Sequence, residues 1–223
     1  MLSFHGKEKI KEKYLKRLKN HYDADEFVKG KYWEKGKGCA VGCTIHGSDH
    51  SRYETEIGIP EWVARVEDKI FEGLPDNIAK EWPLKFLKSI PVGVDLNKIK
   101  IQFLIFIVES VIDKFDHNKF HRIKSEIKKV ISKLKSNSFR NSDCVADANA
   151  DVAAFAAYSA CVSDGDAAAA AYPGYYASAA ATATEEAADA DGHAGDSSKS
   201  KKQLTYKKFS EKLIELIELI EEI

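Results

Sequence analysis

Apolar residues recur at helical spacing along much of the chain, and this periodicity predicts most of its elements. The region 7–29 carries an apolar residue at every fourth position with lysines between, which is typical of one amphipathic helix: Ile10, Tyr14, Leu18 and Tyr22. The glycine at position 30 is the expected end of this helix. No alternating pattern strong enough to predict a strand occurs anywhere in the sequence.

Two successive helices are expected in the next part of the chain. Ser51 and Glu54 fit a capping box ahead of a short helix over 52–57, which would end at Gly58. Pro60 then stands where a helix favours proline in its first turn, so the next helix should start there.

Three longer apolar patterns follow. The pattern at 96–115 is apolar nearly all round and predicts a central helix, whereas 118–135 is cleanly amphipathic. The last, at 203–222, has a stripe like that of a coiled coil: Tyr206, Phe209, Leu213, Leu216, Ile220 and Ile223. It is too short to predict a coiled coil, so we expect this helix to pack back on the protein, with self-association as the alternative.

Composition changes abruptly after residue 140. Residues 141–198 contain no lysine or arginine, ten acidic residues and 22 alanines, whereas 1–140 contain 28 basic and 20 acidic residues. We therefore predict an all-α, multi-helix assembly, orthogonal or bundle-like. Its parts are a helical body (1–140), an acidic alanine-rich segment and linker (141–200), and a closing amphipathic C-terminal helix (201–223) that packs on the body.

Charge and hydropathy also bear on location and partners. The N-terminus has no apolar signal region, and the apolar run 103–108 is too short to span a bilayer, so we expect a cytoplasmic protein without a membrane partner. Cysteines in that setting are reduced thiols or metal ligands. The basic residues are expected along solvated helix faces and no nucleic-acid-binding motif accompanies them, so we do not expect nucleic acid as a partner.

The strongest candidate for chemistry is a run of ligand-type residues with the spacing C-x3-C-x2-H-x3-H, namely Cys39, Cys43, His46 and His50. On a continuous helix all four would share one stripe, but the first and last would lie about 16 Å apart. One zinc ion could take all four only if the chain turns at Gly47. Otherwise it could take the last three, or add a distant ligand such as His21.

Two other interpretations of this segment remain open. Cys39 at a helix N-terminus would have a lowered thiol pKa, and Cys43 could be a nucleophile with His46 or His50 as its base. Alternatively, both cysteines are simply core residues. The acidic side chains of Glu67, Asp68 and Glu72 are expected on a solvated helix face.

Two stretches of the sequence, KGKGCAVGCTIHGSDHSRYETEIGIPEWVARVEDKIFEGLP and EWPLKFLKSIPVGVDL, carry a resemblance to known proteins. Over residues 22–96 the chain resembles a family of uncharacterised bacterial and phage-associated proteins with a K-G-C-A-V-G-C-T-x-H segment followed by Y-E-x-E-x-G-I-P-E-W. The resemblance implies that Cys39, Cys43, His46 and His50 act as a unit, and it implies no activity.

The sequence favours a non-catalytic binding function, with the acidic segment or the Cys39–His50 turn as the contact surface for a protein partner. The alternative is a metal-dependent or cysteine-based enzyme that uses the same turn. No cofactor is required by any motif in the chain, and zinc is the candidate metal.

Overall fold

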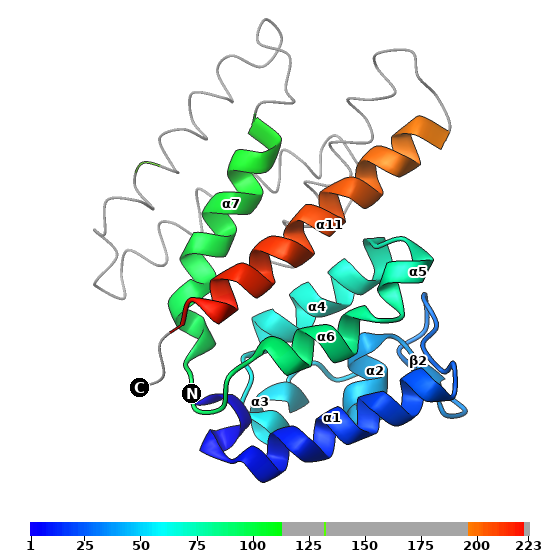
Figure 1. The fold of residues 1–223 in the computed structure, drawn as a ribbon, viewed down its shortest axis with the longest axis vertical. Coiled ribbons are helices and arrows are strands. Elements are labelled where there is room, and N and C mark those ends of the chain that lie inside the picture. The colour runs from blue at the N-terminus through cyan, green and yellow to red at the C-terminus, as the bar shows by residue number, and fades with distance from the viewer. Residues whose placement is uncertain (113–131, 133–195, 221–223) are drawn as a thin grey trace, which may run out of the picture. The chain divides into compact units, whose positions relative to one another are not determined.

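A computed structural model of the protein describes residues 1–112, 132 and 196–220. The chain divides into two compact units, one made of residues 1–100 and 206–223 and the other of residues 101–205. In the described part of the chain, helices dominate and the only strands form one two-stranded antiparallel sheet, β1–β2 (Figure 1). The predicted all-α fold class is confirmed.

The elements are, in chain order, the 3-10 helix η1 (Ser3–Gly6), α1 (Glu8–Asp23), β1 (Trp33–Glu34), β2 (Lys37–Gly38), α2 (Ala40–Ile45), α3 (Arg52–Ile57), α4 (Glu61–Gly73), α5 (Asp76–Ala79), α6 (Trp82–Ser89), the 3-10 helix η2 (Leu96–Ile99), α7 (Lys100–Ile112) and α11 (Asp196–Glu218). None of the described helices is both long and apolar enough to cross a membrane.

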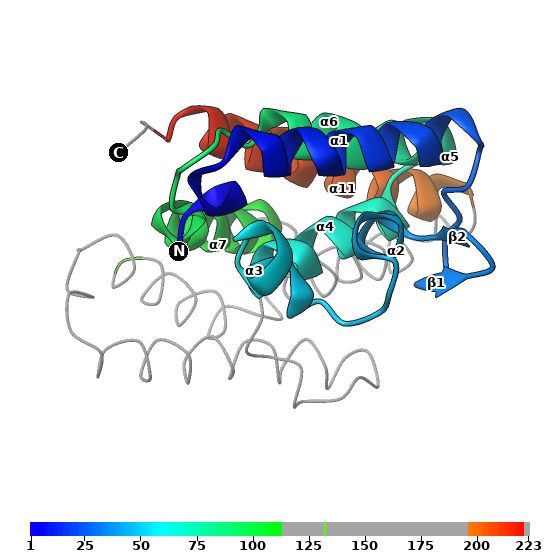
Figure 2. The same ribbon diagram turned by 90° about the horizontal axis from the view of Figure 1, so that it is seen from below.

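Helices α1 and α6 pack side by side in the first unit, and α2, α3 and α4 lie against one another below them (Figure 2). The apolar faces that the sequence predicted meet between these layers. Leu18 of α1, Ile70 of α4 and Phe86 of α6 are all fully buried. Burial of such side chains is the main force that holds short helices like α2 and α3 in place.

The first helix is shorter than predicted. It ends at Asp23 instead of continuing to residue 29, and Asp25 takes a left-handed backbone conformation with φ of 53°. Aspartate tolerates this conformation better than most residues. After this turn, the buried Phe27 forms an isolated parallel β-bridge with Gly38 of β2. The residues predicted to end the helix therefore pack against the β1–β2 hairpin instead.

The short helix α3 has the predicted bounds and the predicted left-handed Gly58 after its last residue. The predicted capping box is wrong, because Ser51 is already helical and its side chain caps nothing. Asp49 instead stabilises the start of this turn, because its carboxylate accepts hydrogen bonds from the Ser51 backbone N–H (3.0 Å) and the Ser51 hydroxyl (2.7 Å). The chain therefore begins to turn before Ser51.

The C-terminal helix α11 starts at Asp196, before the predicted start and within the predicted linker. The apolar stripe predicted for it is buried as far as the structure describes it: Tyr206, Phe209, Leu213, Leu216 and Ile220. Residues 206–220 are part of the first unit. The predicted helix at 118–135, apart from residue 132, and the alanine-rich segment up to residue 195 lie outside the described residues.

The contact of α11 with α4 gives a test of this packing. A Cβ atom at Gly73 would lie 2.0 Å from Cδ2 of the buried Tyr206 ring. We therefore expect Gly73→Ala to lower the free energy of unfolding by about 1–3 kcal/mol through overpacking, although alanine is the better helix former. Urea denaturation measures the change. The double variant with Tyr206→Leu should recover part of the loss, and a stabilised Gly73→Ala protein would contradict the contact.

Candidate metal centre

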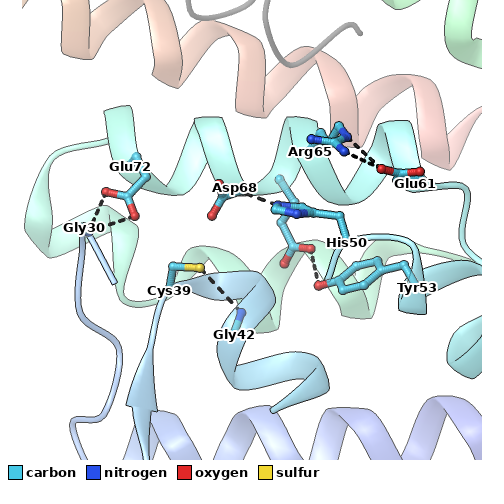
Figure 3. Close-up of polar contacts among 10 residues, drawn as sticks. Gly30, Cys39, Gly42, His50, Tyr53, Glu61, Arg65, Asp68 and Glu72 are labelled. Atoms are coloured by element: carbon cyan, nitrogen blue, oxygen red, sulfur yellow. Dashed lines mark hydrogen bonds and ion pairs between the residues drawn. The ribbon is translucent and has the colours of Figure 1, made fainter. Parts of the chain in front are cut away.

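Three side chains that can bind metal converge between α4 and the start of α2. Asp68 and Glu72 lie one turn apart on α4 and project toward Cys39, which precedes α2 (Figure 3). One sulfur or oxygen atom from each residue lies within 4.8 Å of those of the other two. In the part of the chain that the structure describes, this is the one cluster of three or more such residues with this spacing.

Cys39 is positioned by close backbone packing. Its N–H donates to the Lys31 carbonyl oxygen (2.7 Å), and its Sγ accepts a hydrogen bond from the Gly42 N–H (3.5 Å) at the N-terminus of α2. The Tyr32 carbonyl oxygen lies so close to α2 that a Cβ at Gly42 would be 1.4 Å from it. Only glycine fits at that position, so the glycine-rich sequence here serves the close approach of the loop to the helix.

Glu72 joins the same loop to α4. Its two carboxylate oxygens accept hydrogen bonds from the Gly30 N–H, each at 3.0 Å. Burial raises the pKa of Glu72, and the Gly30 amide partly offsets that effect. The carboxylate is thus held in one orientation beside Asp68 and Cys39.

Asp68 is the least satisfied member of the cluster. Only 4% of its surface is exposed, and its Oδ1 atom has no hydrogen-bond partner within the described residues. The Nε2 atom of His50 lies 3.8 Å from Asp68 Oδ2, which is too long for a hydrogen bond. A buried carboxylate oxygen without a partner is costly and requires an explanation.

A pocket of about 210 Å³ opens beside the three ligand-type side chains. Its remaining lining residues come from the loop before α2 and from α4: Gly30, Lys31, Tyr32 and Lys69. The cluster therefore has space next to it for an ion and a further small ligand.

The electrostatics of Cys39 contradict the lowered pKa that its helix N-terminal position predicted. Burial raises the thiol pKa well above its ordinary value, and the negative charge of Asp68 together with a hydrogen bond to its side chain raises it further. The Gly42 amide acts in the opposite direction but is the smaller effect. The thiolate form therefore needs a nearby cation, such as a metal ion, to be stable here.

Glu67, the residue before Asp68, is also buried, although the sequence predicted a solvated face for both. The Tyr53 hydroxyl donates a hydrogen bond to Glu67 Oε2 (2.7 Å). Burial raises the pKa of Glu67 to about 8, so at neutral pH this carboxyl favours its protonated form. The solvated-face expectation fails because α2 and α3 both pack on α4.

The structure separates the four residues of the predicted motif. Cys39 joins Asp68 and Glu72, and His50 lies beside Asp68. Cys43 is buried, and its thiol donates to the Gly38 carbonyl oxygen (3.4 Å). His46 instead faces His21, with 2.9 Å between their Nε2 atoms.

Sequence reasoning missed Asp68 and Glu72 as candidate ligands. Their separation of four residues puts both on one face of a helix, which is a usable signal for a shared site. The lysine and arginine on the same helix, Lys69 and Arg65, obscured that signal by suggesting a solvated surface.

Comparisons with known proteins give no information on the role of this site, because no family model, curated protein or solved structure matches the chain.

Glu67 gives a prediction for the pH dependence of stability in metal-free protein. Its pKa is about 8 when folded and near 4.5 when unfolded, so the folded state holds an extra proton between these values. The free energy of unfolding should then fall by about 1.4 kcal/mol per pH unit across that window because of this group. Glu67→Gln should remove this contribution while keeping an oxygen that accepts from Tyr53. Urea denaturation at pH 5, 6, 7 and 8 gives both slopes, and equal slopes would refute the assignment.

The two thiols give a second prediction. Because burial raises the pKa of Cys39 and raises that of Cys43 to about 12, both should react with iodoacetamide at pH 7.5 far more slowly than in urea-unfolded protein. Mass spectrometry of the alkylated peptides measures each rate. A rapidly modified Cys39 in folded, metal-free protein would instead support the cysteine-nucleophile hypothesis.

Proposed function

We propose that this protein binds one divalent transition-metal ion, with zinc as the best match, through Cys39, Asp68 and Glu72. The observation that carries the proposal is the buried Asp68 carboxylate, whose Oδ1 atom has no hydrogen-bond partner in the described residues and one of whose oxygens lies near a thiol and a second carboxylate. Three groups that become negative on ionisation repel one another unless protons or a cation lie among them. A metal ion would supply that cation.

The donor set favours zinc over the hard cations. Calcium and magnesium take oxygen ligands, whereas a thiolate together with carboxylates suits zinc, which accepts sulfur at about 2.3 Å and oxygen at about 2.0–2.2 Å. Ligand atoms within 4.8 Å of one another need only small side-chain movements to reach one ion. Zinc would also replace the proton on Cys39, because its charge stabilises the thiolate.

His50 is suited to support this ion. Its ring is buried, and its Nε2 atom lies 3.8 Å from Asp68 Oδ2, on the same carboxylate that would bind the metal. A histidine in this position either orients the ligating carboxylate or supplies a fourth ligand after a small shift. The proposal thus retains Cys39 and His50 from the predicted motif and replaces the other two ligands by Asp68 and Glu72.

Two uses of such an ion fit the geometry. A site that only binds metal, or holds the loop onto α4, agrees with the non-catalytic binding function that the sequence favoured. A metal-dependent enzyme is the second candidate, favoured by the adjacent pocket, since three protein ligands would leave one position of a tetrahedral ion open. The raised thiol pKa argues against Cys39 as a free nucleophile.

Isothermal titration of metal-free protein with Zn²⁺ tests the proposal. We expect one high-affinity ion per chain whose binding requires Cys39 and Asp68, and a higher melting temperature with the ion bound. Cys39→Ser and Asp68→Asn should each weaken Zn²⁺ binding at least tenfold. The matched control is Glu61→Gln, the same kind of change on the same helix at a carboxylate that pairs with Arg65, and it should bind Zn²⁺ normally.

Two results would contradict the proposal. One is the absence of saturable Zn²⁺ binding to folded protein, as judged by circular dichroism. The other is Zn²⁺ binding that Asp68→Asn and Glu61→Gln weaken equally, because that would place the ion elsewhere.

A further inference from the structure

A second group of ligand-type side chains lies at the other end of α2. His21 comes from the last turn of α1, and His46 follows the last residue of α2. Their Nε2 atoms are 2.9 Å apart and their rings are nearly perpendicular, at 85°. Two imidazole nitrogens from different elements thus point at one location.

The His21 ring is held by Glu26. Its Nδ1 atom lies 2.6 Å from Glu26 Oε2, so in the neutral ring the Nδ1–H donates to the carboxylate. This tautomer, inferred from the hydrogen bond, leaves the lone pair of Nε2 directed at His46. Histidines that bind metal ions commonly donate their other ring N–H to a carboxylate in this way.

His46 is held in an unusual position. It has a left-handed backbone conformation, with φ of 52°, and its ring stacks on Trp33 with 4.4 Å between centroids and 13° between planes. Partial removal of the ring from water and the nearby Arg17 lower the pKa of His46, which favours the neutral ring that can bind a metal. Because His46 is exposed, solvent and ions can reach the pair.

We infer that His21 and His46 form a second metal-binding site, selective for transition-metal ions that prefer imidazole, such as Ni²⁺, Cu²⁺ and Zn²⁺. Two nitrogens bound to one tetrahedral zinc ion lie roughly 3.3 Å apart, given bonds of about 2.0 Å, so the pair needs to open only slightly. His46 would move its proton from Nε2 to Nδ1, and the ion would take the place of that proton between the rings. Water would fill the remaining coordination positions.

Nearby charges act on a bound cation in both directions. Arg17 and Arg52 are close enough to affect His46; Arg52 pairs with Glu56, whereas Arg17 donates to the neutral Thr44 carbonyl oxygen and keeps its positive charge. Glu26 adds a negative charge directly behind His21. This site shares no residue with the Cys39 cluster, so it does not depend on the proposed function.

Ni²⁺ titration followed by tryptophan fluorescence tests the inference, because a paramagnetic ion at His46 would quench the stacked Trp33. We expect saturable quenching that chelator reverses, and at least a tenfold loss of Ni²⁺ affinity in His46→Gln. The matched control is His5→Gln, which alters another exposed histidine, one that contacts the Thr55 carbonyl oxygen, and should leave the titration unchanged. Asp68→Asn should also leave it unchanged, which separates this site from the first.

Glu26→Gln provides a second measurement that a purely structural role would not move. Loss of such a supporting carboxylate typically weakens metal binding by roughly 10- to 100-fold, and we expect that range here while the melting temperature without metal changes little. His46 and Glu26 are not fully buried, so both variants should fold. Equal Ni²⁺ affinity in the wild-type and His46→Gln proteins, or no saturable quenching, would overturn the inference.

Discussion

The burial of carboxylates on α4 is the constraint on which the rest of this site depends. A charged carboxylate removed from water is strongly destabilising unless a proton, hydrogen bonds or a cation compensate it. Glu67 and Asp68 are neighbours and both are buried, yet they meet this constraint differently. Glu67 has a raised pKa and accepts a hydrogen bond from Tyr53 on Oε2, while its Oε1 atom, like Asp68 Oδ1, has no partner in the described residues. Asp68 differs because it faces a thiol and a second carboxylate that a cation could bridge.

The loop before α2 makes this burial possible because it packs on both helices at once. At one end Gly30 donates to Glu72, and at the other the Tyr32 carbonyl oxygen lies against Gly42. These contacts fix the backbone on both sides of the Cys39 side chain without using the thiol itself. The sulfur is therefore placed by the backbone, and it also accepts a hydrogen bond from the Gly42 N–H.

Local pattern was enough to predict the helices, because apolar spacing and terminal glycines act within a few residues. It predicted α3 with its Gly58 end and the buried stripe of α11. It failed at the end of α1, where Phe27 leaves the helix to pair with Gly38, a contact between residues eleven positions apart that helical spacing cannot reveal. Local spacing therefore predicts that a helix forms, but it does not predict the residue at which a tertiary contact ends the helix.

The candidate site was predictable only where its residues are close in sequence. Cys39 and His50 were identified from their spacing, but Asp68 and Glu72 were assigned to solvent because their burial depends on the packing of α2 and α3 against α4. His21 was considered as a distant ligand. Its pairing with His46 depends on the packing of α1 on α2, and the local sequence pattern could not predict that packing.

The separation of the four motif residues into two groups follows from the length and ends of α2. A helix of six residues places Cys39 before its first turn and His46 after its last, and a single ion cannot reach both ends. The left-handed conformation of His46 then turns the chain after α2. As a result His50 lies beside Asp68 of α4, whereas His46 contacts His21 of α1. Residues with the spacing of one zinc site are thus placed apart when a short helix lies between them and each end of that helix meets a different neighbour.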